Sequence, residues 1–238
     1  MSPQTQQQPK VLFVLTSHDQ LGNSGKPTGW YLPEFAHPYE ILAPHAQITI
    51  ASVRGGASPL DPASIEAAQD DVSVSFLKNR ESLWKNTAPL SEFVGRAEEF
   101  DALFYVGGHG PMFDLAHNET SHKLISEFHS LNRIVAAVCH GPAALAYAKL
   151  PSGKYFLENT PVTGFSNAEE QIVQAVDLMP FALETALNEA SNGKFEKAAE
   201  DWGVKVVVAR DGKVITGQNP ASASGVGEAI LAELRKRA

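Results

Sequence analysis

The chain contains a single cysteine, Cys139, among its 238 residues. A lone thiol excludes an internal disulfide bond, and the paired-cysteine spacing of a structural zinc site is also absent. No run of five basic residues occurs and the formal net charge is -8, which argues against nucleic acid as a partner. No apolar stretch is long enough to cross a bilayer, so no membrane association is expected.

The first residues are rich in glutamine and lack the apolar core of a signal peptide. We therefore expect a disordered tail at residues 1–9 and a cytoplasmic protein, with the nucleus as a second compartment. The single cysteine fits a reducing compartment of this kind.

Apolar, β-branched runs alternate with helical segments along most of the chain. Strands are predicted at 11–15, 48–53, 102–106, 134–138, 160–164, 204–209 and 214–216, and helices at 33–43, 124–131, 143–148, 168–176, 181–190 and 222–235. Asp211-Gly212 predicts a hairpin between the last two strands, and Ser222 is a candidate N-cap for the last helix. This alternation indicates an α/β sandwich with a mostly parallel central sheet, formed by one domain at 10–238. The polar segment at 57–90 predicts a small cap-like insertion.

Cys139 lies where a predicted strand turns sharply into a predicted helix, in the sequence Cys139-His140-Gly141-Pro142. This is the geometry of a nucleophile elbow. There, the amides and dipole of the helix N-terminus would lower the pKa of the thiol from about 8.5 to between about 3.5 and 7.5. The alternative is a buried structural cysteine, but the position between strand and helix favours a reactive thiol.

A nucleophilic thiol needs a base, and the adjacent His140 is the candidate. Neighbouring side chains face each other only on a strained turn, so His140 could instead supply its backbone N–H to an oxyanion hole. A carboxylate should orient the imidazole. The downstream candidates are Glu158, Glu169, Glu170 and Asp177. The predicted strand end at 163–164, followed by a helix start, favours Glu169 or Glu170, and spacing does not decide between them. Their simpler interpretation is a favourable interaction with the helix dipole.

Two other segments carry candidate site residues. Gly107-Gly108-His109-Gly110 follows a predicted strand, and its glycines would let backbone amides approach a developing oxyanion. Glu34 lies in an aromatic-rich segment after the first loop, where a carboxyl beside a thiol could exchange a proton with it. A glutamate in a first helical turn also suits the helix dipole. The remaining histidines match no metal-binding pattern, so neither a metal nor another cofactor is expected.

Six segments resemble the DJ-1/PfpI superfamily, within the class I glutamine-amidotransferase-like fold: LTSHD, KPTGWYLPEFAHPYEIL, FYVGGHGPMFDL, AAVCHGPAAL, TGFSNAEE and ITGQNPASA. They are most similar to the fungal heat-shock-protein branch, the glutathione-independent glyoxalases, also called glyoxalase III or D-lactate dehydratase. The resemblance implies a flavodoxin-like α/β sandwich, a homodimer, and a lyase that needs no metal or cofactor. Its substrates would be small 2-oxoaldehydes, with methylglyoxal converted to D-lactate and glyoxal to glycolate.

The resemblance also implies roles for individual residues. Cys139 would be the nucleophile that forms a hemithioacetal, His140 its partner and Glu170 the third member of the triad. Glu34 would contact the cysteine. The loop Gly107-Gly108-His109 would border the pocket, with the Gly108 and His140 backbones forming the oxyanion hole and His109 lining the cavity.

Three other functions compete with this interpretation. A stress-response holdase chaperone, with misfolded client proteins as partners, would need exposed apolar surface. A cysteine redox sensor would use the same accessible, low-pKa thiol. A cysteine peptidase or amidase would also use the elbow, but the aromatic residues Trp30 and Tyr31 predict a pocket that is small for a peptide.

Overall fold

The central sheet contains seven strands in the order β3-β2-β1-β4-β5-β7-β6. The computed structural model describes residues 8–237. The strands are β1 (Lys10–Leu15), β2 (Gln47–Ser52), β3 (Ala88–Pro89), β4 (Ala102–Tyr105), β5 (Ile134–Val138), β6 (Val206–Ala209) and β7 (Val214–Gly217). All neighbouring strands are parallel except β6 and β7, which form the predicted antiparallel hairpin. The predicted α/β sandwich with a mostly parallel sheet is confirmed.

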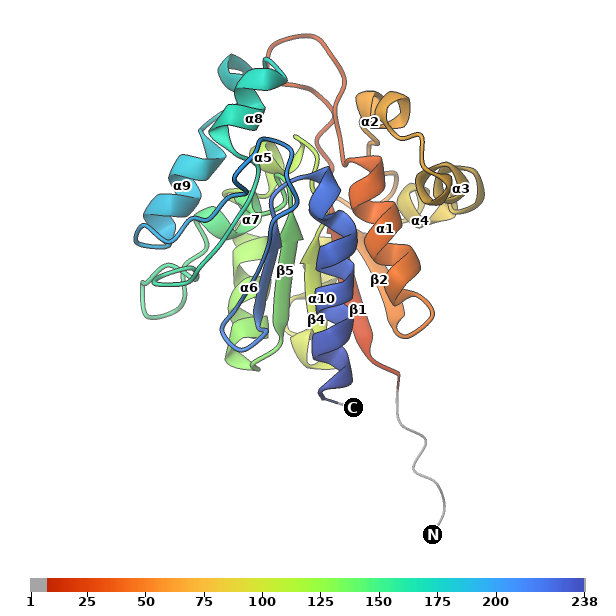
Figure 1. The fold of residues 1–238 in the computed structure, drawn as a ribbon. Helices are drawn as coiled ribbons and strands as arrows, with labels where there is room; N and C mark the ends of the chain where they lie inside the picture. Colours follow the sequence, from red (N-terminus) through yellow and green to blue (C-terminus); the bar gives the residue numbers. More distant parts are fainter. Residues whose placement is uncertain (1–7, 238) are drawn as a thin grey trace.

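Helices cover both faces of the sheet (Figure 1). The α-helices are α1 (Leu32–Leu42), α2 (Pro62–Ala67), α3 (Asp71–Asn79), α4 (Ser82–Lys85), α5 (Pro111–Asp114), α6 (Glu119–Ser130), α7 (Ala143–Ala146), α8 (Asn167–Ile172), α9 (Leu183–Ala190) and α10 (Ala223–Arg235). Helices α1 and α10 pack together on one face, and α6 packs on β4 and β5 on the other. Because both faces are covered, β4 and β5 are buried along their whole length, as their continuous apolar sequences require. Among residues 8–237, no helix combines the length and apolarity needed to cross a membrane.

Residues 57–90, where the sequence predicts a cap-like insertion, form α2, α3 and α4 and end in β3. An aromatic cluster joins this region to α1. Phe76 packs on Phe35 with ring centroids 4.8 Å apart, and Trp84 packs on Trp30 at 5.3 Å. All four rings are buried, so the region adds its own aromatic core beside the segment that leads into α1.

Two local predictions are wrong. Residues 160–164 form no strand, and only an isolated bridge links Val162 to Phe195. The reason is that the Thr163 N–H donates to the Thr216 hydroxyl at 2.9 Å instead of to a backbone carbonyl. Ser222 does sit at the start of α10, but its side chain does not cap the helix; its hydroxyl donates to Asn219 Oδ1 at 2.9 Å.

Candidate active site

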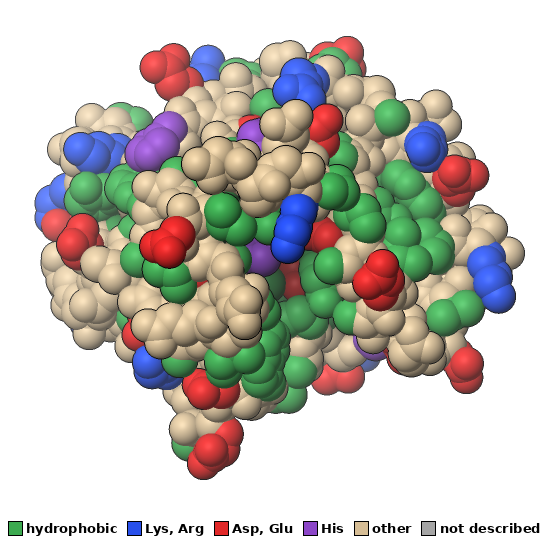
Figure 2. Space-filling view, turned by 90° about the horizontal axis from the view of Figure 1, so that it is seen from above, with side chains coloured by type: hydrophobic (Ala, Val, Ile, Leu, Met, Phe, Trp, Pro, Cys, Tyr) green, Lys and Arg blue, Asp and Glu red, His purple; other side chains and the backbone are tan. Residues whose placement is uncertain are grey.

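The loops after β4 and β5 meet α1 and α8 at the carboxyl edge of the sheet. They enclose a small cavity of about 60 Å³, lined by Tyr31, Glu34, Gly108, His109, Cys139, His140, Phe165, Val173, Trp202 and Pro220. Figure 2 looks onto this edge and shows a histidine and acidic side chains recessed near the middle of the face. The structure thus brings together Glu34, Gly108, His109, Cys139 and His140, and Glu170 lies directly behind the two histidines.

Cys139 occupies the predicted sharp turn between β5 and α7. Its φ is +60°, a left-handed conformation that costs a non-glycine residue about 1–3 kcal/mol. Hydrogen bonds on both sides hold it there. The Cys139 N–H donates to the Gly217 carbonyl at 2.9 Å, and the Phe165 N–H donates to the Cys139 carbonyl at 2.9 Å. The strained backbone projects the thiol into the cavity, as expected of a nucleophile elbow.

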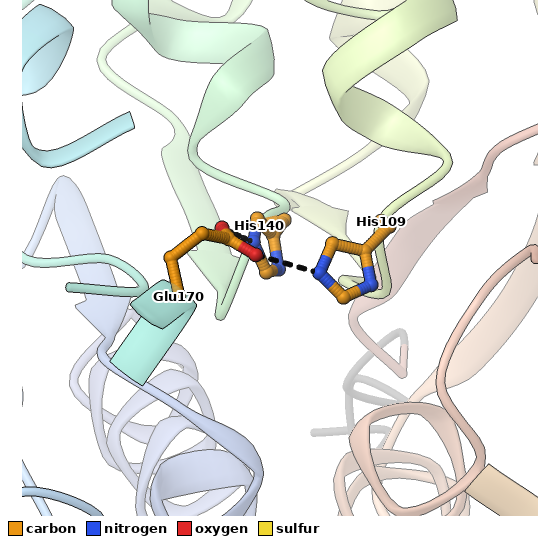
Figure 3. A group of neighbouring side chains, drawn as sticks. All are labelled: His109, His140 and Glu170. Carbon is orange, nitrogen blue, oxygen red and sulfur yellow. Dashed lines mark hydrogen bonds and ion pairs between the residues drawn. The ribbon is translucent and has the colours of Figure 1, made fainter. Parts of the chain in front are cut away.

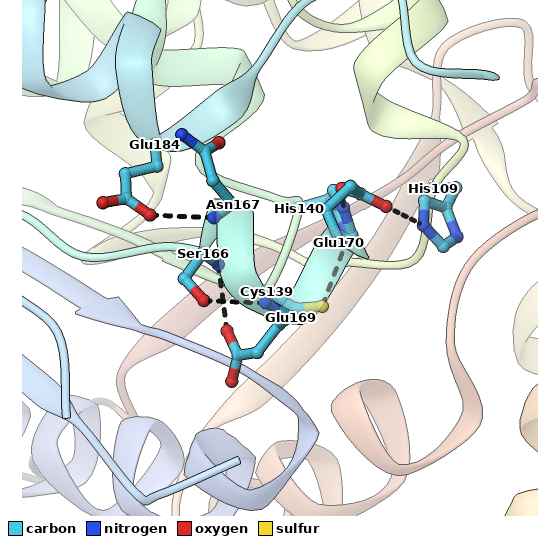
Figure 4. Close-up of polar contacts among 8 residues, drawn as sticks. All are labelled: His109, Cys139, His140, Ser166, Asn167, Glu169, Glu170 and Glu184. Carbon is cyan, nitrogen blue, oxygen red and sulfur yellow. Dashed lines mark hydrogen bonds and ion pairs between the residues drawn. The ribbon is translucent and has the colours of Figure 1, made fainter. Parts of the chain in front are cut away.

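The thiol, an imidazole and a carboxylate form a hydrogen-bonded series (Figure 4). Cys139 Sγ lies 3.4 Å from His140 Nδ1, and His140 Nε2 lies 2.7 Å from Glu170 Oε2. An ionised carboxylate only accepts hydrogen bonds, so the ring proton of neutral His140 is on Nε2. His140 Nδ1 is therefore free to accept a proton from the thiol. Burial lowers the pKa of His140, which keeps the ring neutral and basic.

Glu170 holds a second histidine with its other oxygen (Figure 3). His109 Nε2 lies 2.9 Å from Glu170 Oε1, and the rings of His109 and His140 are 4.3 Å apart between centroids. Burial alone would raise the pKa of Glu170, but the charges and hydrogen bonds of His140 and His109 outweigh it and lower the pKa. Glu170 is therefore a carboxylate that keeps its charge and orients two imidazoles.

The adjacent Glu169 has a structural environment instead. It forms a capping box with Ser166 at the start of α8, in which each side chain accepts the other residue's backbone N–H (Figure 4). Its Oε1 also accepts hydrogen bonds from Asn219 Nδ2 at 2.8 Å and Gln218 Nε2 at 3.0 Å. The choice that the sequence left open is therefore settled by geometry: Glu170, and not Glu169, contacts His140.

Glu34 reaches the cavity from α1 and is completely buried. Neither of its carboxyl oxygens has a hydrogen-bond partner that meets ordinary geometry within residues 8–237. It lies beside the thiol across Gly107, where any Cβ would overlap both Glu34 Oε2 and Cys139 Cβ. Burial raises the pKa of Glu34 well above its usual range. Position 107 must therefore be glycine. The buried Glu34 carboxyl tends to hold a proton.

The expected lowering of the Cys139 pKa is wrong. Burial and the negative charge of Glu34 raise the pKa of the thiol. Helix α7 is only four residues long, so its dipole is small, and the ionisable group beside the thiol is a carboxyl instead of a cation. Glu34 raises the pKa of the thiol, whereas the interaction with Cys139 lowers that of Glu34 against the larger effect of burial, so the Glu34–Cys139 pair titrates as a coupled unit.

Two backbone amides are placed to bind an oxyanion. Gly108 lines the cavity with Cys139 and Glu34 and adopts a φ of +96° that favours glycine. The His140 N–H donates to no acceptor within residues 8–237. Both amides belong to the loops that the sequence singled out, and such donors are worth most in a cavity that excludes water.

The sequence did not predict the outer wall of the cavity. Trp202 and Val173 line it while each remains about two-fifths exposed, at 41%. The backbone N–H of Trp202 donates to Glu169 Oε1 at 3.2 Å, and the ring centroids of Trp202 and Phe165 are 5.7 Å apart. Trp202 lies in an irregular loop with no periodic pattern, so no local signal places it at the cavity.

Only one group of described residues has the spacing of metal ligands, namely His109, His140 and Glu170, with donor atoms within 4.8 Å of one another. The two Nε2 atoms already bond to Glu170 at 2.9 and 2.7 Å. A metal would have to displace both ring protons and would separate Glu170 from His140. The arrangement fits a hydrogen-bonded trio better than a metal centre.

Comparison with known proteins identifies the family of the chain. The sequence profile of the DJ-1/PfpI family matches residues 34–233. The chain is 30% identical over 220 residues to the glutathione-independent glyoxalase hsp3102 of Schizosaccharomyces pombe, covering 88% of this chain and 90% of that protein. The crystal structure of glyoxalase III from Candida albicans superposes with a TM-score of 0.83 at 26% identity, covering 94% of this chain and 96% of that one. The Rapid Encystment Protein of Francisella tularensis superposes with a TM-score of 0.88 at 39% identity, covering 95% and 99%.

Proposed function

The chain belongs to the DJ-1/PfpI family, and we propose that it is a glutathione-independent glyoxalase of the lyase class, which converts methylglyoxal to D-lactate and glyoxal to glycolate. Relatives over most of the chain bear the name glyoxalase. The observation that carries the proposal is the Glu34–Cys139 pair, a nucleophile and a proton-holding carboxyl enclosed in a cavity of about 60 Å³. Such a cavity suits a molecule with a few heavy atoms.

The first step is addition of the thiol to the substrate. In the form of the pair in which Glu34 holds the proton, the Cys139 thiolate attacks the aldehyde carbon C1 of methylglyoxal. The C1–O1 π electrons move to O1, where the amides of Gly108 and His140 stabilise the charge, and O1 takes the proton from Glu34. The product is a hemithioacetal, and Glu34 is now a carboxylate base.

The second step is isomerisation. The Glu34 carboxylate removes the proton on C1, the electron pair forms a C1–C2 double bond, and the same carboxyl returns the proton to C2. A proton must also leave O1 and another must arrive at O2. The result is a thioester of lactate on Cys139. Oxidation at C1 is balanced by reduction at C2, so no redox cofactor takes part.

The last step is hydrolysis of the thioester. His140 Nδ1, held in the basic tautomer by Glu170, takes a proton from water as the oxygen attacks the thioester carbonyl. The Cys139 thiolate leaves, lactate is released, and the Glu34–Cys139 pair regains one proton while a second passes to solvent.

The cavity volume of about 60 Å³ argues against a peptidase, because a peptide and its flanking residues need a much larger cleft.

The resemblance of the sequence to the glyoxalase branch also supports two coarser proposals. We propose that the protein is a homodimer and that it acts in the cytoplasm, with the nucleus as a second compartment. Size-exclusion chromatography with light scattering tests the first of these, and fractionation of the source cells tests the second.

D-lactate formation from methylglyoxal, without glutathione and with a chelator present, tests the proposed function. We expect activity in the wild type and complete loss in Cys139→Ala, because the substrate is bound covalently through Sγ. A folded wild-type protein with a reduced thiol that forms no lactate would contradict the proposal. If Cys139→Ala retained the activity, the covalent mechanism would be wrong.

A further inference from the structure

We propose that His109 is a second acid–base catalytic residue, which carries the proton from O1 to O2 of the bound substrate during isomerisation. The inference rests on the proposed glyoxalase function. It names the residue for the O1-to-O2 proton transfer, a step to which the mechanism above assigns none of Glu34, Cys139 and His140. It follows from three observations: where the ring lies, what holds it and which of its atoms is free.

The first observation is the position of His109 in the cavity. It directly follows Gly108, and it lines the same cavity of about 60 Å³ as Cys139 and Glu34. Its side chain remains 18% exposed, whereas that of His140 is 1% exposed. A 2-oxoaldehyde bound to Cys139 would share this small space with the His109 ring.

The second observation is the bond to Glu170. His109 Nε2 donates to Glu170 Oε1 at 2.9 Å, as His140 Nε2 donates to Oε2 at 2.7 Å (Figure 3). One carboxylate therefore orients both rings. Its negative charge stabilises one imidazolium in the trio, on whichever ring carries it, while two charged rings with centroids 4.3 Å apart would repel each other.

The third observation is the free ring nitrogen. His140 Nδ1 is occupied by the thiol at 3.4 Å, but His109 Nδ1 has no hydrogen-bond partner within residues 8–237. In Figure 3 this nitrogen lies on the side of the ring away from Glu170. The two histidines thus divide the work: His140 Nδ1 serves the sulfur, and His109 Nδ1 is available to the substrate oxygens.

The chemistry balances with a neutral His109 whose ring proton is on Nε2. As Glu34 removes the C1 proton, the C2–O2 π electrons move to O2 and give an enediolate. His109 Nδ1 then takes the proton from O1 while the C1–O1 double bond forms and C2 takes the proton from Glu34. The imidazolium returns its proton to O2, so His109 ends neutral, with one proton moved from O1 to O2 and one from C1 to C2.

The test compares His109→Gln with wild type in two assays. The glutamine amide can still donate to Glu170 but cannot transfer a proton, so we expect kcat for lactate formation to fall by about 10²–10⁴-fold. With methylglyoxal deuterated at C1, the primary isotope effect on kcat should increase, because isomerisation becomes rate-limiting. The rate of Cys139 alkylation by iodoacetamide should stay at the wild-type value, because the bonds from His140 to Cys139 and Glu170 remain.

His129→Gln is the matched control, since His129 is exposed on α6 outside the cavity, and its kcat should equal that of wild type. If His109→Gln does not fold, as judged by thermal melting, His109→Asn takes its place in the same assays. A kcat unchanged in the folded variant would overturn the inference. So would alkylation that slows by the same factor as kcat, which would make His109 only a positioning residue for Glu170. A wild type that forms no lactate would overturn the proposed function and this inference with it.

Discussion

Two carboxyl groups approach the Cys139 elbow from opposite sides, Glu34 from α1 and Glu170 from α8. Both are buried, but their surroundings differ. Glu34 has no well-formed hydrogen bond among the described residues, and burial raises its pKa. Glu170 bonds to His140 and His109, which lower its pKa in spite of burial. The α1 side of the elbow therefore stores a proton, and the α8 side stores a negative charge.

This difference shows how a site without positive side chains makes a nucleophile. When Glu34 holds the one proton of the pair, Cys139 is a thiolate that can attack, and that proton then moves to the substrate. The charge of Glu170 keeps His140 in the tautomer that can act as a base. The two carboxyl groups therefore have different roles. Replacing each of them in turn by glutamine tests this difference.

The largest effect should come from Glu170→Gln. Its amide can present an N–H to His140 and stabilise the tautomer in which Nδ1 carries the proton, which is the wrong form for a base. We expect kcat to fall by about 10⁴-fold, as in other triads that lose the orienting carboxylate, and alkylation of Cys139 to slow as well. Glu169→Gln is the matched control on the same helix. If Glu169→Gln lost as much activity as Glu170→Gln, Glu169 would have to be placed in the site.

The next largest effect should come from Glu34→Gln. An amide fills the same space but neither gives a proton to O1 nor removes one from C1, so we expect kcat to fall by about 10²–10⁴-fold. Thermal unfolding near neutral pH should show a midpoint no lower than that of wild type, because glutamine is buried without the cost of protonating a carboxyl. Glu40→Gln, on the exposed side of α1, controls for the helix. Near-normal turnover in Glu34→Gln would refute the proton shuttle.

Glu169→Gln should affect stability more than chemistry. The carboxylate of Glu169 accepts hydrogen bonds from Ser166, Trp202, Gln218 and Asn219. An amide replaces one acceptor by a donor and leaves buried groups unpaired, which we expect to cost about 1–3 kcal/mol in the free energy of unfolding. Urea denaturation measures this cost. The folded variant should still be alkylated at Cys139 at the wild-type rate, and slower alkylation would show that the capping box also supports the thiol.

The smallest effect is on the pH dependence of stability, where the two carboxyl groups should act in opposite directions. Glu170 has a lowered pKa, so its stabilisation is present above the unfolded value of about 4.3 and is lost as the pH falls below it. Glu34 has a raised pKa, so the folded state loses stability as the pH rises from about 4.3 towards that raised value.

Urea unfolding from acidic to mildly alkaline pH should reveal both slopes. Glu170→Gln should flatten the loss of stability on the acid side, and Glu34→Gln should flatten the loss on the alkaline side. Identical profiles for the two variants would contradict the assignment of one carboxyl to storing a proton and the other to storing charge.

Local sequence signals were sufficient for the elbow and for the glycine loop. The β-branched run at 134–138 followed by Gly141-Pro142 predicts a strand that ends in a sharp turn, and Cys139 is found there with a φ of +60°. The signal is local because the turn itself is closed by neighbouring residues, through the bond from the Gly141 N–H to the Val138 carbonyl at 2.8 Å, and the distant Gly217 and Phe165 then hold Cys139 in place. The same holds for Gly108, which follows the end of β4.

Other features depend on residues that are distant in the sequence. His109 and Glu170 are 61 positions apart, and their bond exists only because β4 and the start of α8 meet at one edge of the sheet. The helix start after Cys139 predicts a stabilised thiolate. In the fold, burial and the carboxyl of Glu34 beside the thiol raise the pKa of Cys139 instead. Whether Glu169 or Glu170 faces His140 depends on the rotation of α8, which the contacts of Glu169 with Gln218 and Asn219 determine.

By itself, the sequence determined the layered α/β architecture, the position of the single thiol on a sharp turn and the loops that surround it, because hydrophobic periodicity and turn residues act over a few neighbouring positions. Only the tertiary structure decided which carboxyl stores a proton and which stores a charge. Proton affinity depends on burial and on the groups within a few ångströms, and both are set by packing between elements that are far apart in the chain.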